Sequence, residues 1–236
     1  MDVKIRQAQE NILRISSKIS SDFALAGGTA LELYYLKHRF SSDLDFFSPE
    51  YNFAEIDRLV LRFNNASIGK LKLDSEFIAS NKAKVRFYSM PVKHSRRKLK
   101  IDFVEDVVLK KPRIVRFSGV AVYDAKDIYL HKLVAICGAV LEEDAVGKDI
   151  VTGRQEARDA FDVYMLSRKI QPLHIFLKNV SRLLQRGMVC WYQTFSRHEL
   201  KLGLLDLDIY DPKFDSKEMI VYLESEIEKF AKETLK

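Results

Sequence analysis

A five-residue run in which two acids flank one apolar residue and two phenylalanines follow constrains this chain most: Asp43-Leu44-Asp45-Phe46-Phe47. In an extended strand, side chains two positions apart share a face, so Asp43 and Asp45 project together while Leu44 packs behind them. Two carboxylates this close repel each other unless a cation lies between them. Mg²⁺ is bound by one or two carboxylates and keeps positions for substrate phosphates. The run therefore predicts a metal site, although the same spacing is common on surface turns.

A glycine pair precedes this run by about one helix length. Gly27 and Gly28 are followed by Thr29 and a stretch that suits a short helix. Glycines before a helix let backbone N–H groups approach a phosphate closely, and the helix N-terminus favours negative charge. Thr29 or the glycines could also cap the helix. A simple turn is the alternative interpretation.

Together, these two features resemble the first motif of the polymerase-beta-like nucleotidyltransferases, in the version of the AbiEii/AbiGii-type toxin family. The resemblance lies in residues 25–47, where Arg39, Ser41, Asp43 and Asp45 match an Arg-x-Ser-x-Asp-x-Asp pattern. It implies transfer of a nucleoside monophosphate from a nucleoside triphosphate, with Mg²⁺ or Mn²⁺ as the metal. It also implies that the nucleotide contacts Gly27, Gly28, Thr29 and Ser41.

A third carboxylate is expected on a neighbouring strand. Leu99, Ile101 and Phe103 alternate with polar residues, which predicts a strand with Asp102 on the face opposite the apolar set. An ordinary half-buried strand with a polar outer face is the alternative. The family's second motif implies that Asp102 helps Asp43 and Asp45 hold the metal and accepts the proton of the attacking hydroxyl.

Two helical segments complete the resemblance. Residues 127–135 predict a helix that carries Lys132, which the family pattern implies as a catalytic contact to the triphosphate. Residues 154–166 match an Arg-Asp-x-x-Asp pattern, which places Asp159 and Asp162 on one helical face. The pattern implies a catalytic Asp159, a substrate-binding Arg158, and an Asp162 that orients a basic side chain. A solvated lysine and a surface ion-pair cluster are the alternatives.

Changes in hydrophobic period predict the organisation of the chain. Residues 1–20 and 53–63 have helical periodicity, residues 68–122 shift toward a period of two, and the chain from residue 124 onward is helical with breaks near 147–153, 171–172 and 206–215. We expect an α+β (α/β) fold: a polymerase-beta-like core over residues 1–122, with a mixed β-sheet flanked by helices, and a helical bundle over 123–236. The predicted cleft has the three aspartates on one wall and Lys132 and Asp159 on the other.

The composition is that of a globular protein. Of the 236 residues, 47% are apolar and 31% are charged, which excludes a disordered chain. No apolar run approaches the length of a membrane span, and the N-terminus lacks the apolar core of a secretory signal. Cys137 and Cys190 have no metal-ligand or redox spacing. These features predict a cytoplasmic protein with no membrane partner.

The charge pattern indicates which kind of molecule could accept the transferred nucleotide. The net charge is +6 and the pI about 9.1, which favours polyanions. A basic run, Lys93 to Lys100, directly precedes Asp102 and could steer a triphosphate or an RNA backbone, although a solvated hairpin tip is nearly as good an interpretation. A second basic and aromatic area, residues 182–201, favours ordinary helix packing over RNA stacking.

The resemblance implies that the acceptor is RNA, at the 3′ end of a transfer RNA, and that the protein acts as a toxin in toxin–antitoxin or phage defence, with an antitoxin protein as partner. Two alternatives stay open. Relatives with the same core transfer a nucleotide to a protein or to a small hydroxylated molecule such as an antibiotic. The other is a non-catalytic interaction protein with a degenerate nucleotide pocket.

Overall fold

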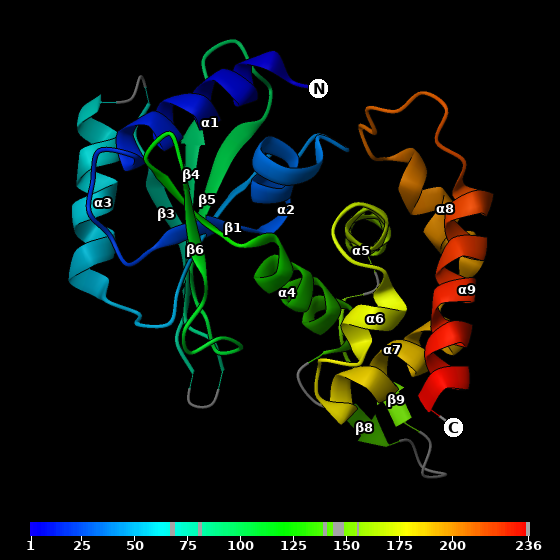
Figure 1. Cartoon of the computed structure of the whole chain (residues 1–236). Coiled ribbons are helices and arrows are strands. Elements are labelled where there is room, and N and C mark those ends of the chain that lie inside the picture. Colours follow the sequence, from blue (N-terminus) through cyan, green and yellow to red (C-terminus); the bar gives the residue numbers. More distant parts are fainter. Residues whose placement is uncertain (67–68, 80–81, 139–140, 144–148, 155, 235–236) are drawn as a thin grey trace. The chain divides into compact units, whose positions relative to one another are not determined.

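The computed structural model describes residues 1–66, 69–79, 82–138, 141–143, 149–154 and 156–234 (Figure 1). By contacts within the chain it divides into two compact units, one of residues 1–35 and 40–127 and one of residues 36–39 and 128–236. The short segment 36–39 belongs to the second unit although it lies in the sequence between two parts of the first.

The first unit contains a seven-stranded sheet in the order β3-β4-β5-β2-β1-β7-β6. Strand β2 pairs in parallel with β5 and antiparallel with β1, so the predicted mixed sheet is confirmed. Strands β3 to β6 lie within the segment 68–122 that was predicted to be β-rich, and β7 ends one residue beyond it. The elements are α1 (Val3–Ser16), β1 (Ala24–Ala26), α2 (Gly27–Ala30), η1 (Leu31–Leu36, a π-helical turn that ends in the second unit), β2 (Leu44–Ser48), α3 (Phe53–Ala66), β3 (Lys72–Phe77), β4 (Val85–Pro91), β5 (Lys98–Glu105), β6 (Ile114–Phe117) and β7 (Val120–Tyr123).

Helices α1 and α3 supply much of the core of this unit and lie beside the sheet in Figure 1. Apolar side chains recur along α1 at helical spacing, and Ile5 and Ile12 are fully buried. From α3, Ile56 and Phe63 are also fully buried. The helix α1 ends at Ser16, so Ile19, which was predicted to continue its apolar stripe, lies beyond it.

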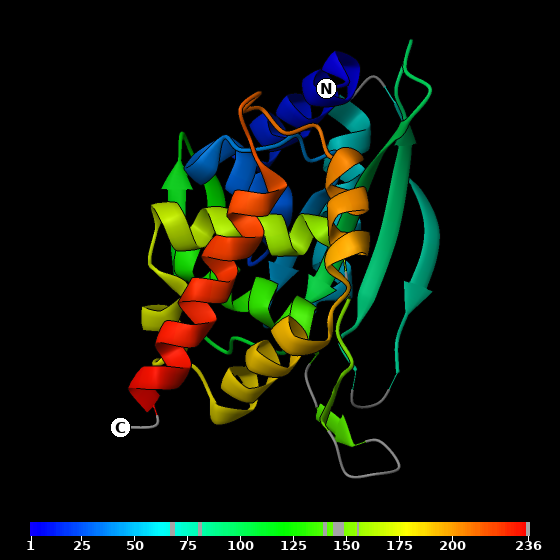
Figure 2. The ribbon, with the colours of Figure 1, turned by 90° about the vertical axis from the view of Figure 1, so that its right-hand side faces the viewer.

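The second unit is mostly helical. Helix α9 contacts α5, α6, α7 and α8, and Figure 2 shows it crossing α5. The predicted apolar stripe of this last helix is present, with Leu223, Ile227 and Phe230 buried. The elements are α4 (Ala125–Cys137, which begins in the first unit), β8 (Leu141–Glu143), β9 (Asp149–Val151), α5 (Ala157–Lys169), α6 (Leu173–Leu177), α7 (Arg182–Thr194), α8 (Arg197–Leu205) and α9 (Ser216–Thr234).

One element of the second unit differs from the prediction. Strands β8 and β9 pair as an antiparallel hairpin where the hydrophobic pattern predicted helix and a break. Each strand has only three residues, too few for a period of two to stand out from the helical pattern around it. Of the predicted break at 147–153, residues 147 and 148 lie outside the described residues. Within the described ranges, no helix is long and apolar enough to cross a membrane.

Candidate active site

The predicted carboxylates come together on one face of the sheet. Strand β2 begins at Leu44, directly after Asp43, and pairs in parallel with β5 so that Asp45 is the register partner of Asp102. Leu44 and Phe46 are buried and have Ile101 and Phe103 as register partners, on the opposite face. The strand prediction for Asp102 is therefore confirmed, and Asp43, two residues before Asp45, follows on the same side.

Gly27 lies directly against this acidic face. It is the first residue after β1, whose last residue pairs with Asp45 in the antiparallel register. Its φ of +68° is one that side-chain-bearing residues rarely adopt, and a Cβ added there would overlap the Asp45 carboxylate. The turn thus brings the backbone of Gly27 and Gly28, at the start of α2, next to the predicted metal ligands.

The segment before Asp43 is held by buried polar groups of the first unit. Thr29 is fully buried, and its hydroxyl donates to the backbone oxygen of Asp43 and, at 3.4 Å, to that of Ser41. The backbone N–H of Ser41 donates to Glu32 Oε2 at 2.8 Å, and its oxygen accepts from Gln9 Nε2 at 2.9 Å. The Thr29 hydroxyl is thus engaged with the protein backbone, and its predicted contact with the nucleotide stays a prediction.

Two of these residues were missed by sequence reasoning. Glu32 and Gln9 are buried polar residues that fix the backbone ahead of the aspartates. Gln9 lies on the apolar stripe of α1, and an amide on such a stripe is the signal that could have found it. The Ser41 hydroxyl, by contrast, makes no hydrogen bond within the described residues and stays a candidate phosphate contact.

Electrostatics show that the three acids act on one another. Burial, and then the negative charges of Asp45 and Asp43, raise the pKa of Asp102 to about 7. Within the described residues, no three His, Cys, Asp or Glu side chains are already arranged to hold a metal ion. The three carboxylates thus share one side of the sheet without forming a ready ligand set. Their donor chemistry and shared face fit Mg²⁺.

The raised pKa gives a pH-dependent stability prediction. A carboxyl whose folded pKa exceeds its unfolded value of 3.8 binds protons more tightly when folded, so its contribution to stability falls as the pH rises from about 4 to 7. In metal-free protein, Asp102→Asn should raise the Tm at pH 8 by about 2–4 °C, the effect of about 1 kcal/mol in a chain of this size. At pH 4, where the acid is already protonated, the gain should disappear. Thermal unfolding in EDTA measures both, and an equal gain at both pH values would contradict the assignment.

The second unit contains a buried charged cluster centred on Asp162. Its Oδ1 accepts from Arg39 Nε and lies 2.8 Å from His38 Nε2, and its Oδ2 accepts from Arg39 Nη2, each at 2.8 Å. The Lys132 ammonium lies 2.8 Å from Oδ2 and also donates to Asp159 Oδ1 at 2.7 Å. Both aspartates are fully buried on one face of α5, as their spacing predicted.

Charge balance explains how this cluster tolerates burial. Two buried cations, Arg39 and Lys132, face the two carboxylates. Burial disfavours the charged acid, but Arg39 and Lys132 outweigh it and hold the pKa of Asp162 well below its usual range. Burial lowers the pKa of His38 despite its hydrogen bond to Asp162, so the imidazole is neutral and donates from Nε2.

The contacts within this cluster can be compared with the roles predicted for Lys132, Asp162 and Arg158. Lys132 is buried between two acids, so the solvated-lysine alternative is wrong. The predicted task of Asp162, to orient a basic side chain, matches its bidentate hold on Arg39. Arg158 lies outside the cluster and pairs with Glu156. The catalytic roles of Lys132 and Asp159 and the cleft between the two parts of the chain stay predictions.

The second basic and aromatic area behaves as ordinary packing. Trp191 and Tyr192 on α7 are buried, and Trp191 stacks on Phe195 with ring centroids 4.4 Å apart. These faces are covered by protein, so they offer no stacking surface to RNA. The basic run 93–100, in contrast, begins in the hairpin between β4 and β5, as expected, and leads directly to Asp102.

Comparisons with known proteins agree with this geometry. The sequence profile described as "Nucleotidyl transferase AbiEii toxin, Type IV TA system" matches residues 12–231. The chain belongs to this family. Among proteins with curated descriptions, none matches the sequence. Membership sets nucleotidyl transfer as the class of activity and places the AbiEii chain with toxins of toxin–antitoxin systems, so the resemblance read from the sequence is confirmed.

Two solved structures have the same fold. One is a candidate nucleotidyltransferase from H. pylori, with 19% identity, a TM-score of 0.58, and coverage of 98% of this chain and 96% of that one. The other is JHP933 from Helicobacter pylori, with 20% identity, a TM-score of 0.57, and coverage of 98% and 94%. At these identities the likeness concerns the fold alone, and it agrees with the predicted nucleotidyltransferase fold class of the AbiEii chain.

Proposed function

We propose that this AbiEii-family protein transfers a nucleoside monophosphate from a nucleoside triphosphate to a hydroxyl at the 3′ end of an RNA, with transfer RNA as the favoured acceptor. The observation that carries the proposal is the pairing of Asp45 with Asp102 on adjacent parallel strands, with Gly27 against the same carboxylates. Modification of the 3′ end of a transfer RNA would block translation, which suits a toxin. An antitoxin protein is the proposed partner.

Different residues of the first unit would bind the metal, contact the phosphates and accept the proton. Asp43, Asp45 and Asp102 would hold Mg²⁺, or Mn²⁺ in its place, and the bound metal would supply the positive charge that phosphoryl transfer needs. Backbone N–H groups of Gly27 and Gly28 would donate to phosphate oxygens, and the Ser41 hydroxyl could add one more contact. Asp102 is also the proposed acceptor of the proton that leaves the attacking hydroxyl.

The second unit would contribute charge. Lys132 is proposed to contact the triphosphate and Asp159 to hold the lysine in place, as the 2.7 Å ion pair between them supports. Arg158, which is partly exposed, is proposed to contact the substrate from the same helix.

Labelled nucleotide transfer tests the proposal directly. The protein is incubated with Mg²⁺, each of the four labelled ribonucleoside triphosphates in turn, and total RNA, and the RNA and the protein are then separated. Label in the transfer RNA fraction, lost when EDTA is added, is the expected result. Label on protein alone would favour the alternative acceptor, and no label anywhere would contradict nucleotidyl transfer under these conditions.

A further inference from the structure

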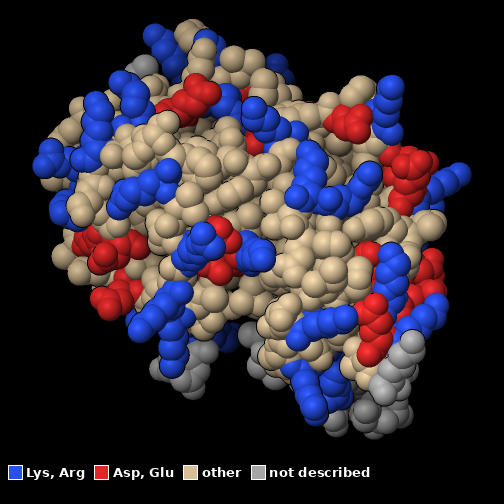
Figure 3. All heavy atoms as spheres, in the orientation of Figure 1, with Lys and Arg blue, Asp and Glu red and all other residues tan. Residues whose placement is uncertain are grey.

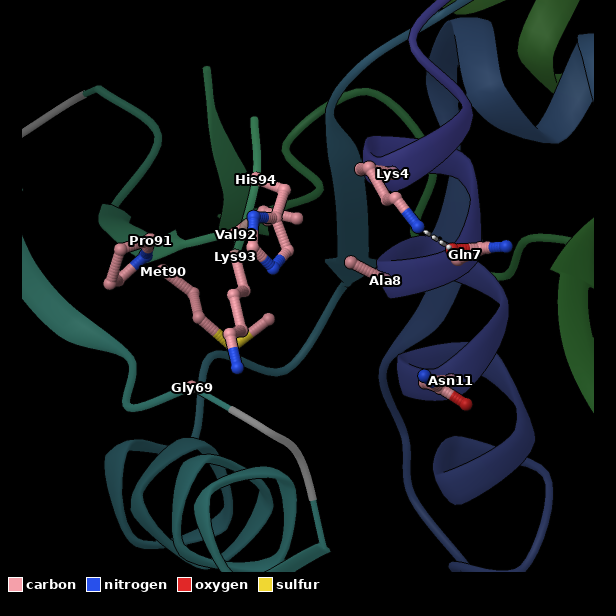
Figure 4. Close-up of a pocket in the computed structure, with 10 residues that line it drawn as sticks. All are labelled: Lys4, Gln7, Ala8, Asn11, Gly69, Met90, Pro91, Val92, Lys93 and His94. Atoms are coloured by element: carbon pink, nitrogen blue, oxygen red, sulfur yellow. Dashed lines mark hydrogen bonds between the residues drawn. The ribbon is translucent and has the colours of Figure 1, made fainter. Parts of the chain in front are cut away.

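A pocket lies between the first turns of α1 and the start of the β4–β5 hairpin. Its volume is about 240 Å³, and Lys4, Gln7 and Asn11 line it from the helix while Met90, Lys93 and His94 line it from the strand end. Figure 4 shows these two sets of side chains on two sides of one space. We call it the α1–hairpin pocket. All of its residues belong to the first unit.

The walls of the pocket are fixed by the fold. Asp2 caps α1 by accepting from the backbone N–H of Lys4, and its other carboxylate oxygen accepts from Ser95 Oγ at 2.7 Å, which ties the helix start to the hairpin. Gly69 closes the floor so tightly that a Cβ there would lie 2.6 Å from Met90 Cγ. The cap, the hairpin contact and the close approach of Gly69 to Met90 fix the backbone around the pocket, and the exposed side chains of Lys4, Gln7 and Lys93 line its rim.

The pocket is lined by three kinds of side chain: basic, amide and apolar. Lys4, Lys93 and His94 are exposed, and no acidic residue lines the pocket within the described ranges. Met90 is almost fully buried and forms an apolar wall. Gln7 Oε1 accepts from Lys4 Nζ at 3.4 Å (Figure 4), and Asn11 Oδ1 accepts from Arg14 Nη2 at 3.2 Å. The NH₂ groups of the two amides are therefore the donors that they can offer to a base. Arg96, Arg97 and Lys98 extend the positive charge along the same hairpin.

This combination matches one nucleotide of a single-stranded RNA. An unstacked base has flat apolar faces and an edge of donors and acceptors, and phosphates lie on both sides of it along the strand. Cations likewise lie on both sides of the pocket, Lys4 on the helix and Lys93 on the hairpin. The volume is below the range of about 300–1,000 Å³ of sites for whole small molecules, so it suits one base better than a complete substrate.

The pocket is separate from the candidate active site. Met90 is the register partner of Leu99, which shares the buried face of β5 with Ile101, whereas Asp102 is on the opposite face. We propose that the α1–hairpin pocket binds one base of the acceptor RNA, away from the reacting 3′ end, and that the basic hairpin holds the adjoining phosphates. The inference rests on the proposed function for RNA as acceptor.

Equilibrium binding tests the phosphate contacts without any nucleotide transfer. Fluorescence anisotropy with a labelled 12-nucleotide single-stranded RNA is measured over a range of salt concentrations, with no triphosphate present. Lys4→Gln/Lys93→Gln should weaken binding by about tenfold and reduce the slope of log K against log salt by roughly 1.4, which is 0.7 for each lost phosphate contact. Lys126→Gln/Lys217→Gln removes the same charge at exposed positions outside the pocket and should leave the slope unchanged.

The base contact is tested with an RNA that lacks bases at its central positions. Wild-type protein should bind this abasic RNA more weakly than the complete strand, and Gln7→Ala/Asn11→Ala should reduce that difference. The proposal would be overturned if Lys4→Gln/Lys93→Gln and Lys126→Gln/Lys217→Gln had the same slope of log K against log salt. Equal binding of complete and abasic RNA by the wild-type protein would also overturn it. Displacement of RNA by polyglutamate from the wild type alone would instead assign the pocket to an acidic peptide. Since no transfer is measured, failure of the proposed function leaves these results interpretable.

Discussion

Asp45→Asn is expected to lower nucleotidyl transfer by about 1,000-fold, equivalent to about 4 kcal/mol of transition-state stabilisation. The change removes a negative charge from the face shared with Asp102 and retains the side-chain volume. The fold should be kept, and the Tm of metal-free protein should not fall, because the substitution relieves repulsion between carboxylates. Initial rates with saturating Mg²⁺ and labelled triphosphate, beside thermal unfolding, measure the two effects.

A matched control separates this loss from a general effect of charge. Asp22 is an exposed aspartate of the same unit, so Asp22→Asn makes the same chemical change outside the acidic face. It should transfer nucleotide at the wild-type rate. Normal transfer by Asp45→Asn would show that the metal assignment is wrong, and a large loss in both variants would point to a nonspecific cause.

Asp162→Asn is expected to destabilise the protein by about 3–5 kcal/mol, the usual result of removing one partner from a buried ion pair. In this variant Arg39 loses its bidentate carboxylate, and Lys132 keeps only Asp159 as a buried anion. Asp159 also pairs with the half-exposed Arg154 at 3.1 Å, so Lys132 shares its remaining buried anion. Urea unfolding measures the change as a lower midpoint concentration.

An exposed ion pair supplies the control for this substitution. Glu228 and Lys232 on α9 lie 3.2 Å apart with both side chains largely exposed, and Glu228→Gln should change the free energy of unfolding by less than about 1 kcal/mol. If Asp162→Asn unfolds at the same urea concentration as Glu228→Gln, the cluster contributes little to stability and its buried charges are not coupled as the contacts indicate.

Much of the candidate site could be predicted because its signals are local. Alternation at Asp43, Leu44 and Asp45 depends only on the two-residue period of a strand, and the same period placed Asp102 on a polar face. Helical spacing likewise put Asp159 and Asp162 on one face. The short β8–β9 hairpin was missed because three residues are too few to show a period.

Residue spacing was therefore enough to predict the type of the longer elements and the faces that carry the acids, because the period of a strand or a helix fixes which side chains share a face. Which distant residues meet became visible in the folded chain alone: Asp45 pairs with Asp102, and Arg39 binds Asp162 across 123 positions of the chain. The tertiary structure also showed that Lys132 is buried between acids, where a helix pattern alone favoured a solvated side chain. Strand register and buried ion pairs depend on the energy of the whole packed unit, and no local spacing in the sequence carries that information.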